Sequence, residues 1–258
     1  MPRSSLPHSR LDEIHERGLI RIAIRWAPSA EQYKDPDTGE PAGIVGLLGI
    51  QMAKDLGVRA EFVDLTWADH IPALLEDRVD ICMKHTNTPE RAQKVEFSTG
   101  RVLRYEGKIV VRSDRGILDE NDLNQTHRIF ACGEGDSQEA QIRDSYPLAQ
   151  VHFYPKTENA LAAVDSGEAD ACLADQSVPD FLLLHPECTT LTDENNEPVR
   201  TSIDYSHPMI KPGDQRFLNW VDNWMDFHAV QGTIEQIKQE AHTAFRAKFE
   251  RIVGMSED

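Results

Sequence analysis

The sequence is short of positive charge and has no long apolar run. Only 27 Lys and Arg residues stand against 44 Asp and Glu residues, which gives the 258-residue chain a formal net charge of -17. Because such a chain repels polyanions, we expect neither nucleic acid nor an acidic membrane as a partner. No segment approaches the roughly 20 apolar residues of a membrane-spanning helix, and Met1 to Gly18 lacks the apolar core of a secretion signal.

Cysteine is scarce, and its spacing excludes the common cysteine sites. The four cysteines lack the CxxC or Cys/His spacing of a zinc or redox centre. Three of them fall in short apolar segments that predict buried strands, so we expect reduced thiols in the core. Reduced thiols favour a reducing compartment. The residues are Cys82, Cys132, Cys172 and Cys188.

Nucleotide-binding motifs are missing as well. The segment Gly133-Glu134-Gly135 is not followed by the third glycine of a dinucleotide fingerprint, and no Gly-Lys-Ser phosphate loop occurs. The histidines are scattered and do not show the spacing of metal ligands. We therefore expect no cofactor and no metal.

The composition that remains is typical of a folded acidic protein. Apolar residues make up 40% of the chain and the charges are spread along it. The length allows one large domain or two small ones. Apolar and polar residues alternate from Leu19 to Trp26, which predicts a strand, and a second strand is expected over Ala60 to Leu65. Between them, helical spacing over Gly46 to Leu56 predicts a helix.

One succession of elements occurs twice in the chain. A short helix is predicted over Ile71 to Glu76 and leads to a strand over Val79 to Met83. About 90 residues later, Ala160 to Val164 predicts a helix, which leads through a Ser-Gly turn to a strand over Ala169 to Leu173. Each strand opens with an aspartate after its first residue. Two similarly built α/β lobes are the simplest explanation.

The chain is expected to pass between these lobes twice. A strand over Lys108 to Arg112 is followed by turn residues, which places the first crossing near Val111 to Asp114. The segment Ser202 to Ile210 predicts the returning strand. Two amphipathic helices then follow, with apolar stripes over Phe217 to Phe227 and Ile234 to Ile252.

Five strings, in this order, resemble the bacterial extracellular solute-binding proteins of the polar amino acid ABC transporter type (family 3). The resemblance extends from Leu11 to about Phe249, and the Thr-Pro-Glu-Arg segment followed by Phe-Ser is its most specific part. The strings are LDEIHERGLIRIAI (Leu11 to Ile24), GIVGLLGIQMAKDLGV (Gly43 to Val58), NTPERAQKVEFS (Asn87 to Ser98), GDSQEAQIRD (Gly135 to Asp144) and SGEADACLAD (Ser166 to Asp175).

The resemblance implies a two-lobed α/β fold with two hinge strands, the type II periplasmic-binding-protein-like fold. Lobe 1 would comprise residues 11–111 and 205–258, and lobe 2 residues 112–204. A small zwitterionic or anionic metabolite, an amino acid or a derivative, would be trapped in the cleft between the lobes by hinge closure. The partner would be the permease of an ABC-type importer, and we expect the protein to be a monomer.

The resemblance also assigns the two main ligand contacts. In the family, the Arg of Thr-Pro-Glu-Arg forms a bidentate pair with the ligand carboxylate, and here that residue is Arg91. The family's second anchor, an Asp at the end of a strand in the second lobe, accepts the ligand ammonium and matches Asp175. Thr86 or Thr88 would add a hydroxyl group. Without the resemblance, Arg91 would be expected to form a surface ion pair and Asp175 to occupy a turn.

A third match is the loop that faces the ligand carboxylate with backbone NH groups and a hydroxyl group. Its residues here are Gly135, Asp136 and Ser137. Ser137 is equally well explained as the N-cap of the following helix. The two roles do not exclude each other.

The sequence departs from the family pattern where the first strand ends. Family members commonly have Pro-Phe there, whereas this chain has Ala30-Glu31, and the nearest aromatic residues are Trp26 and Tyr33. Glu31 would favour a cationic ligand, or it would simply face water. Trp26 would replace the missing aromatic contact.

A second departure follows Asp80. The common small pair Ser-Gly is replaced by Met83-Lys84-His85-Thr86, in a segment one residue shorter. Lys84 and His85 would recognise a second anionic group on the ligand. The alternative is that Lys84 pairs with one of the many carboxylates and His85 caps a loop.

Two other functions stay open. Cyclohexadienyl dehydratases share the fold and place a Glu three residues beyond the position of Asp175, where this chain has Val178, so the acid that protonates a departing hydroxyl is missing. Another lyase or isomerase could use Lys84, His85 or Glu31 to move protons. If the chain is the mature form of an exported protein it is periplasmic or extracytoplasmic. If it is native at full length, a cytoplasmic sensor, carrier or enzyme is the better account.

Overall fold

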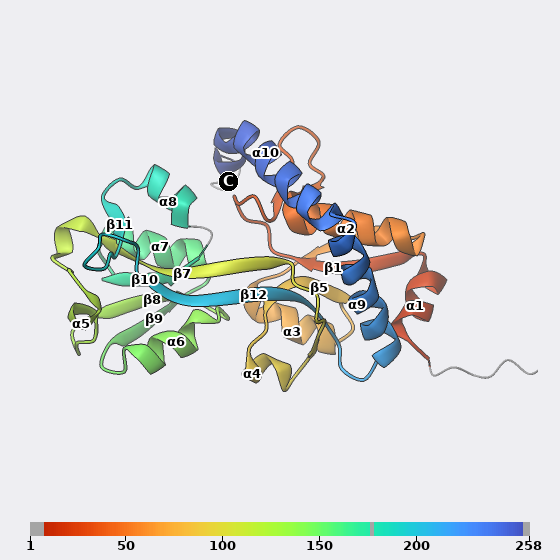
Figure 1. The fold of residues 1–258 in the computed structure, drawn as a ribbon, viewed down its shortest axis with the longest axis horizontal. Coiled ribbons are helices and arrows are strands. Elements are labelled where there is room, and N and C mark those ends of the chain that lie inside the picture. Colours follow the sequence, from red (N-terminus) through yellow and green to blue (C-terminus); the bar gives the residue numbers. More distant parts are fainter. Residues whose placement is uncertain (1–7, 176–177, 255–258) are drawn as a thin grey trace, which may run out of the picture. The chain divides into compact units, whose positions relative to one another are not determined.

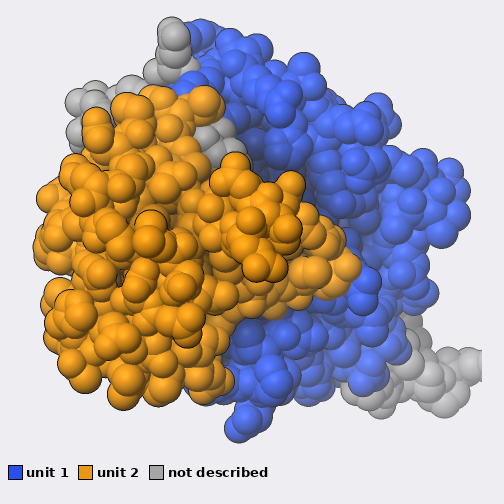
Figure 2. All heavy atoms as spheres, turned by 60° about the vertical axis from the view of Figure 1, so that its left-hand side comes forward, with its two compact units in different colours: residues 1–103, 206–258 blue, residues 104–205 orange. Residues whose placement is uncertain are grey.

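The computed structural model describes residues 8–175 and 178–254 and divides the chain into two compact units. Unit 1 comprises residues 1–103 and 206–258, and unit 2 comprises residues 104–205 (Figure 2). The chain leaves unit 1 at the start of strand β7 (Leu103–Arg112) and returns within β12 (Arg200–Ile210). The first crossing was predicted near Val111 to Asp114, where β7 ends. The structure places the change of unit at the start of β7 instead, after Leu103.

The sheet of unit 1 is built on three parallel strands. β1 (Leu19–Ile24) lies between β4 (Arg59–Asp64) and β5 (Ile81–Thr86), and both neighbours run parallel to it. β12 pairs antiparallel with β5 and also with the short strand β6 (Glu96–Phe97). A separate hairpin is formed by β2 (Tyr33–Lys34) and β3 (Pro41–Ala42).

Helices cover both faces of this sheet (Figure 1). One face packs against α1, α2, α9 and α10, and the other packs against α3 and the segment around α4. The helices of unit 1 are α1 (Arg10–Arg17), α2 (Gly43–Leu56), α3 (Trp67–Leu75), α4 (Pro89–Ala92), α9 (Gln215–Val230) and α10 (Thr233–Gly254).

The alternation in β1 explains how the two faces arise. Ile20, Ile22 and Ile24 are fully buried in the cluster formed with α2, α9 and α10, while Ala23 belongs to the cluster under α3. Successive side chains of a strand point to opposite faces, so a strand between two helical layers needs apolar residues on both. The predicted strand over Leu19 to Trp26 is therefore confirmed, although it ends at Ile24.

Unit 2 repeats this plan. β8 lies between β9 and β10 and runs parallel to both, and β7 pairs antiparallel with β10 and β11. α6 packs on one face, and α7 and α8 pack on the other (Figure 1). The elements are η1 (Ser113–Arg115), α5 (Glu120–Leu123), β8 (Ile129–Gly133), α6 (Gln138–Ser145), β9 (Gln150–Tyr154), α7 (Thr157–Ser166), β10 (Ala171–Ala174), α8 (Val178–Leu184) and β11 (Cys188–Thr190).

The repeat expected from the sequence is present, with one aspartate at the start of a strand in each unit. The Asp80 carboxylate accepts from the backbone NH of Arg21 at 2.7 Å, and the Asp170 carboxylate accepts from the backbone NH of Ile129 at 2.9 Å. Each carboxylate also pairs with an arginine of the neighbouring strand region, Arg21 in unit 1 and Arg128 in unit 2. In both units an aspartate thus links the start of one strand to the backbone of its parallel neighbour: β5 to β1 in unit 1, and β10 to β8 in unit 2.

All four cysteines are buried and free, as predicted. Each lies on a strand: Cys82 on β5, Cys132 on β8, Cys172 on β10 and Cys188 on β11. Burial raises the pKa of the Cys132 thiol to about 12 and that of Cys188 to about 11. These side chains are therefore packing residues, because a protonated, buried thiol is a poor nucleophile.

Candidate functional site

Several residues of unit 1, including the predicted Lys84, His85 and Arg91, gather where its parallel strands end. Arg25 follows β1, Trp67 follows β4 at the first position of α3, and Lys84 and His85 are among the last residues of β5. Parallel strands have their carboxyl ends at one edge of a sheet, which is where open α/β sheets bind ligands. Arg91, on the short helix after β5, extends the same edge.

Trp67 is the common contact of this cluster. The Arg25 guanidinium lies 5.5 Å and the Lys84 ammonium 5.1 Å from the centre of its ring, and both side chains are more than nine-tenths buried. The ring also meets the imidazoles of His70 and His85 edge to face, at 5.0 and 5.2 Å. Such cation contacts with an aromatic face are worth about 2 kcal/mol when desolvated. Sequence reasoning missed Trp67, although its place directly after a parallel strand was a usable signal.

Lys84 and Glu31 form a buried ion pair. Their side chains are 7% and 6% exposed, and the Lys84 ammonium donates directly to the Glu31 carboxylate. The structure therefore bears out the alternative in which Lys84 pairs with an acid. It overturns the expectation of Glu31 as a residue that simply faces water. Buried charges of this kind persist only when they are paired.

The loop that carries Glu31 is fixed by the start of α2. The backbone NH of Val45 donates to the Glu31 carbonyl at 2.8 Å, and that of Ile44 donates to the Ala30 carbonyl at 3.2 Å. Gly43 makes this approach feasible, because its φ is +78° and a Cβ there would lie 2.6 Å from the Glu31 carbonyl carbon.

His85 does not cap a loop but hydrogen-bonds to His70 inside unit 1. His70 Nδ1 and His85 Nε2 are 2.7 Å apart, and the two residues are 2% and 5% exposed. Burial, with the charges of Arg25 and Arg91, lowers the pKa of His70 to about 4. Burial and the charges of Lys84 and Arg91 lower the pKa of His85 well below its ordinary value. Both rings are neutral at pH 7 and add no positive charge.

Arg91 is held in place by its own helix and strand. Its guanidinium Nη1 donates to the Thr86 carbonyl at 3.1 Å, at the end of β5. Its backbone NH donates to the Thr88 hydroxyl at 3.2 Å, so Thr88 is the N-cap of α4. Thr86 and Thr88 thus both support Arg91, one through its carbonyl and the other through its hydroxyl group.

The two aromatic residues expected near the cluster have other contacts. Trp26 packs against the main core of unit 1, and the Lys34 ammonium lies 5.3 Å from the centre of its ring. Tyr33 is buried and meets Phe245 of α10 edge to face at 5.5 Å. Among the described residues of unit 1, Trp67 is the aromatic side chain that contacts Lys84 and His85.

Unit 2 also collects its predicted residues at the carboxyl edge of its parallel strands. Asp175 follows β10, its side chain is half-buried, and its carbonyl accepts from the backbone NH of Val178 at 3.1 Å. Val178, which stands where the dehydratases place a Glu, is 1% exposed and packs in the apolar cluster beneath α7 and α8. An apolar core side chain supplies no proton at this position.

The Gly135 to Ser137 loop follows β8 at the same edge. The Asp136 carboxylate accepts from the Thr157 hydroxyl at 2.9 Å and lies against Gly133, where a Cβ would approach it to 2.4 Å. Ser137 occupies the N-cap position of α6, as one of the two explanations expected, but its hydroxyl group makes no capping hydrogen bond. Ser137 has helical backbone angles, which keep the side chain from reaching the NH groups of the first turn.

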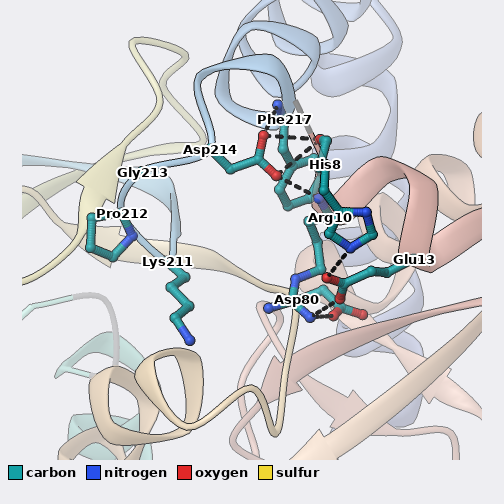
Figure 3. Close-up of a pocket in the computed structure, with 10 residues that line it drawn as sticks. His8, Arg10, Glu13, Asp80, Lys211, Pro212, Gly213, Asp214 and Phe217 are labelled. Atoms are coloured by element: carbon teal, nitrogen blue, oxygen red, sulfur yellow. Dashed lines mark hydrogen bonds and ion pairs between the residues drawn. The ribbon is translucent and has the colours of Figure 1, made fainter. Parts of the chain in front are cut away.

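A pocket of about 140 Å³ in unit 1 lies where α1 and α9 begin (Figure 3). There the Asp214 carboxylate accepts from the Ser9 hydroxyl and from the backbone NH of Phe217, each at 2.9 Å. It thus joins the first residues of both helices. None of the predicted ligand contacts lines this pocket, so we regard it as a structural junction.

Residues 8–175 and 178–254 contain neither a metal-binding cluster nor a membrane-spanning helix. No group of three or more His, Cys, Asp or Glu side chains is arranged to hold a metal ion in these segments. No helix within them is long and apolar enough to cross a membrane.

The structure has two α/β units that share a plan, and each gathers polar residues at the carboxyl edge of its parallel strands. The chain belongs to the bacterial extracellular solute-binding proteins, family 3, whose family model matches residues 20–243. Its fold is accordingly the type II periplasmic-binding-protein-like fold.

Similar proteins include both binders and an enzyme. The chain is 22% identical to cyclohexadienyl dehydratase of Pseudomonas aeruginosa over 88% of this chain and 84% of that protein. It is 28% identical to the ABC transporter glutamine-binding protein of Bacillus subtilis over 65% of this chain and 62% of that protein.

Solved structures with a similar fold include two amino-acid-binding proteins. The ancestral amino acid-binding protein AncCDT-1, described as a precursor of cyclohexadienyl dehydratase, is 30% identical with a TM-score of 0.76, over 90% of this chain and 99% of that one. The cysteine-binding protein of Campylobacter jejuni, at 23% identity, has a TM-score of 0.79 over 92% of this chain and 94% of that one. The latter likeness concerns the fold alone.

Proposed function

We propose that this protein binds a small zwitterionic metabolite, an amino acid or a close relative, and closes its two units around it. Arg91 would hold the ligand carboxylate, and Asp175 would accept its ammonium group. A ligand that bridges both units stabilises only the closed arrangement, so binding and closure draw on the same free energy. No cofactor is needed for this function.

The observation that carries the proposal is the support given to Arg91. One edge of its guanidinium is anchored on the Thr86 carbonyl, and its backbone is fixed by the cap at Thr88. A planar guanidinium held in this way is suited to a carboxylate, because two parallel charge-assisted bonds form without further ordering of the side chain. The glutamine-binding and ancestral amino acid-binding relatives support an amino acid as the ligand.

Asp175 supports the other half of the proposal. It follows β10 at the carboxyl edge of the parallel strands of unit 2, close to the loop of Gly135 to Ser137 in the sheet order. Asp175 matches the family's contact with the ligand ammonium, so we assign the ammonium contact to it and a hydroxyl contact to Ser137.

The test is a thermal-shift screen of the full chain against amino acids, dicarboxylates and opines. A ligand at 100 times its Kd should add about 2.7 kcal/mol to the free energy of unfolding. Arg91→Ala and Asp175→Ala should each lose most of that gain. Arg143→Ala is the matched control, because Arg143 forms an exposed pair with Glu139. A screen without stabilising ligands, or full stabilisation of the Arg91→Ala variant, would contradict the proposal.

A dehydratase or lyase is the second candidate, favoured by the similarity to cyclohexadienyl dehydratase over most of both chains. Burial of Val178 in the core speaks against the dehydratase chemistry at that position. Any stabilising compound should therefore be recovered unchanged after long incubation. Mass spectrometry that detects loss of water from it would move the assignment to an enzyme.

For the cell biology we propose uptake: an extracytoplasmic binding protein that delivers its ligand to the permease of an ABC-type importer and acts as a monomer. The family and the transporter-associated relative from Bacillus subtilis support this role. A cytoplasmic ligand sensor on the same fold is the alternative. Fractionation of the source cells decides between them, since uptake requires the protein outside the cytoplasmic membrane.

A further inference from the structure

A second pocket of unit 1 is lined by α9 and the end of α2. It has a volume of about 700 Å³, and none of the residues proposed to contact the amino acid lines it. Most of its wall comes from one side of α9, because residues three and four positions apart are neighbours on a helix surface. The wall includes Asp55 of α2 and Trp220, Trp224, Asp226, Phe227 and Val230 of α9.

The apolar stripe of α9 continues beyond the core into this pocket. Trp224 is 6% exposed and belongs to the main core of unit 1, whereas Phe227 is 60% and Val230 is 85% exposed. The rings of Trp220 and Trp224 are stacked with their centres 6.5 Å apart. Aromatic side chains therefore extend from the core to solvent at the pocket, and exposed apolar surface of this kind is typical of a surface that contacts another molecule.

The charged residues of the pocket wall are acidic. The Asp55 carboxylate accepts from the Trp224 indole NH and from His228 Nε2, each at 2.8 Å, so it is fixed beside the aromatic rings. Asp226 is exposed on α9. The described part of the chain contributes no Lys or Arg to the lining. A cation in this pocket is attracted by two carboxylates and gains contact with aromatic rings.

We propose that this pocket is a docking site for an arginine side chain of a partner protein. A guanidinium group stacks on aromatic rings, donates to carboxylates and is more weakly hydrated than an ammonium group, so it suits a wall of this composition better than lysine. A free metabolite with the same group would leave Phe227 and Val230 in water, whereas a polypeptide that carries the arginine covers them. A second copy of this chain is a poor partner, because each copy has a net charge of -17.

Two peptides that differ in one charge test this: Ala-Leu-Arg-Leu-Ala and its counterpart with citrulline, the uncharged analogue of arginine. Both have acetylated and amidated ends, so neither offers the free carboxylate and ammonium groups that the proposed amino acid site requires. Each is titrated into the full chain while the indole NH signals of its four tryptophans are followed by NMR. The arginine peptide should move the signals of Trp220 and Trp224 but not those of Trp26 and Trp67. Its Kd should be about 1 mM, at least about tenfold below that of the citrulline peptide.

Variants at exposed positions show which groups provide the affinity. Asp226→Asn should weaken the arginine peptide about fivefold and leave the citrulline peptide unchanged, whereas Phe227→Ala should weaken both. Asp144→Asn is the control, because it removes the same charge at an exposed position of unit 2, and it should change neither affinity by more than about twofold.

Three results would overturn the proposal. They are unmoved signals of Trp220 and Trp224 at about 10 mM arginine peptide, affinities of the two peptides within about twofold of each other, and an unchanged affinity of the folded Asp226→Asn variant for the arginine peptide. The first two need only the wild-type chain. Each leaves the amino acid proposal untouched, because the two sites share no residue.

Discussion

Asp80 and Asp170 occupy equivalent positions in the two units, each at the start of a strand and each bound to the backbone and an arginine of the strand beside it. The Asp80 side chain is fully buried and also pairs with Arg17 at 2.6 Å, whereas that of Asp170 is 14% exposed. The aspartate of unit 1 therefore has more arginine partners and is less exposed to water than the aspartate of unit 2.

From this difference we expect Asp80→Asn to destabilise the protein more than Asp170→Asn. Removing one partner of a buried pair costs about 3 to 5 kcal/mol, and we expect Asp80→Asn near the lower value and Asp170→Asn about half as much. Urea unfolding of both variants measures this, with the exposed Asp144→Asn as control. Equal losses would show that the additional contacts of Asp80 with Arg17 and Arg10 contribute nothing.

The buried histidine pair predicts a loss of stability in mild acid. In the unfolded chain His70 binds a proton near pH 6.5, whereas in the folded chain its pKa is about 4. Between these values the unfolded state takes up more protons, so the free energy of unfolding falls as the pH drops. From pH 7 to pH 5 the His70 contribution is about 2 kcal/mol. His85 and His207, whose pKa values are also lowered, act in the same direction.

Denaturant unfolding at pH 7, 6 and 5 checks this, with His70→Gln as the test variant and the exposed His152→Gln as control. His70→Gln should flatten the pH dependence over this interval, although it weakens the protein at pH 7. A variant whose pH dependence matches that of the wild type would mean that His70 is already protonated in the folded state.

Gly43→Ala should be costly because of where the added methyl group would lie. It would stand 2.6 Å from the Glu31 carbonyl carbon, at a residue whose φ is +78°. We expect a loss of more than about 2 kcal/mol, from the backbone strain and the displaced loop together. Gly57→Ala is the control, since Gly57 has a φ of +69° but nothing within 4 Å, so only the strain of about 1 kcal/mol remains.

Arg91→Lys should lower the affinity for the ligand by about tenfold or more while leaving the free energy of unfolding nearly unchanged. A lysine keeps the charge but cannot hold the Thr86 carbonyl and a ligand carboxylate with one planar group. Titration of a ligand found in the thermal screen measures the change. Arg143→Lys should bind as the wild type does, and an Arg91→Lys variant with unchanged affinity would remove Arg91 from the carboxylate contact.

Much of the fold was accessible from local patterns. Periodic patterns located β1 from the alternation over Leu19 to Trp26 and α2 from the helical spacing over Gly46 to Leu56. A strand or helix with a buried face repeats apolar residues at its own period, which the sequence shows directly. The boundaries were less accurate: α3 begins at Trp67, four residues before the predicted start. Trp67, Ile71 and Leu74 have helical spacing, so the first turn could have been included in the predicted helix.

The candidate site was predicted less completely than the fold. The sequence named Arg91, Lys84, His85 and Glu31 as a group, but not which of them contact one another. Trp67 was missed because it is distant in sequence from Lys84 and His85 and contacts them only through the parallel arrangement of β1, β4 and β5. Asp136 follows β8 and contacts Thr157, which follows the neighbouring parallel strand β9 and is 21 residues away in the sequence.

By itself the sequence determined the family, the two α/β units, the apolar strands and helices, and the positions of the polar residues along the chain. Only the tertiary structure decided that Lys84 is neutralised by Glu31 and that His85 is neutralised by burial against His70. The physical reason is that periodicity and motifs report local geometry, whereas the charge of a buried group depends on its neighbours. Those neighbours are brought from distant segments when the strands pair.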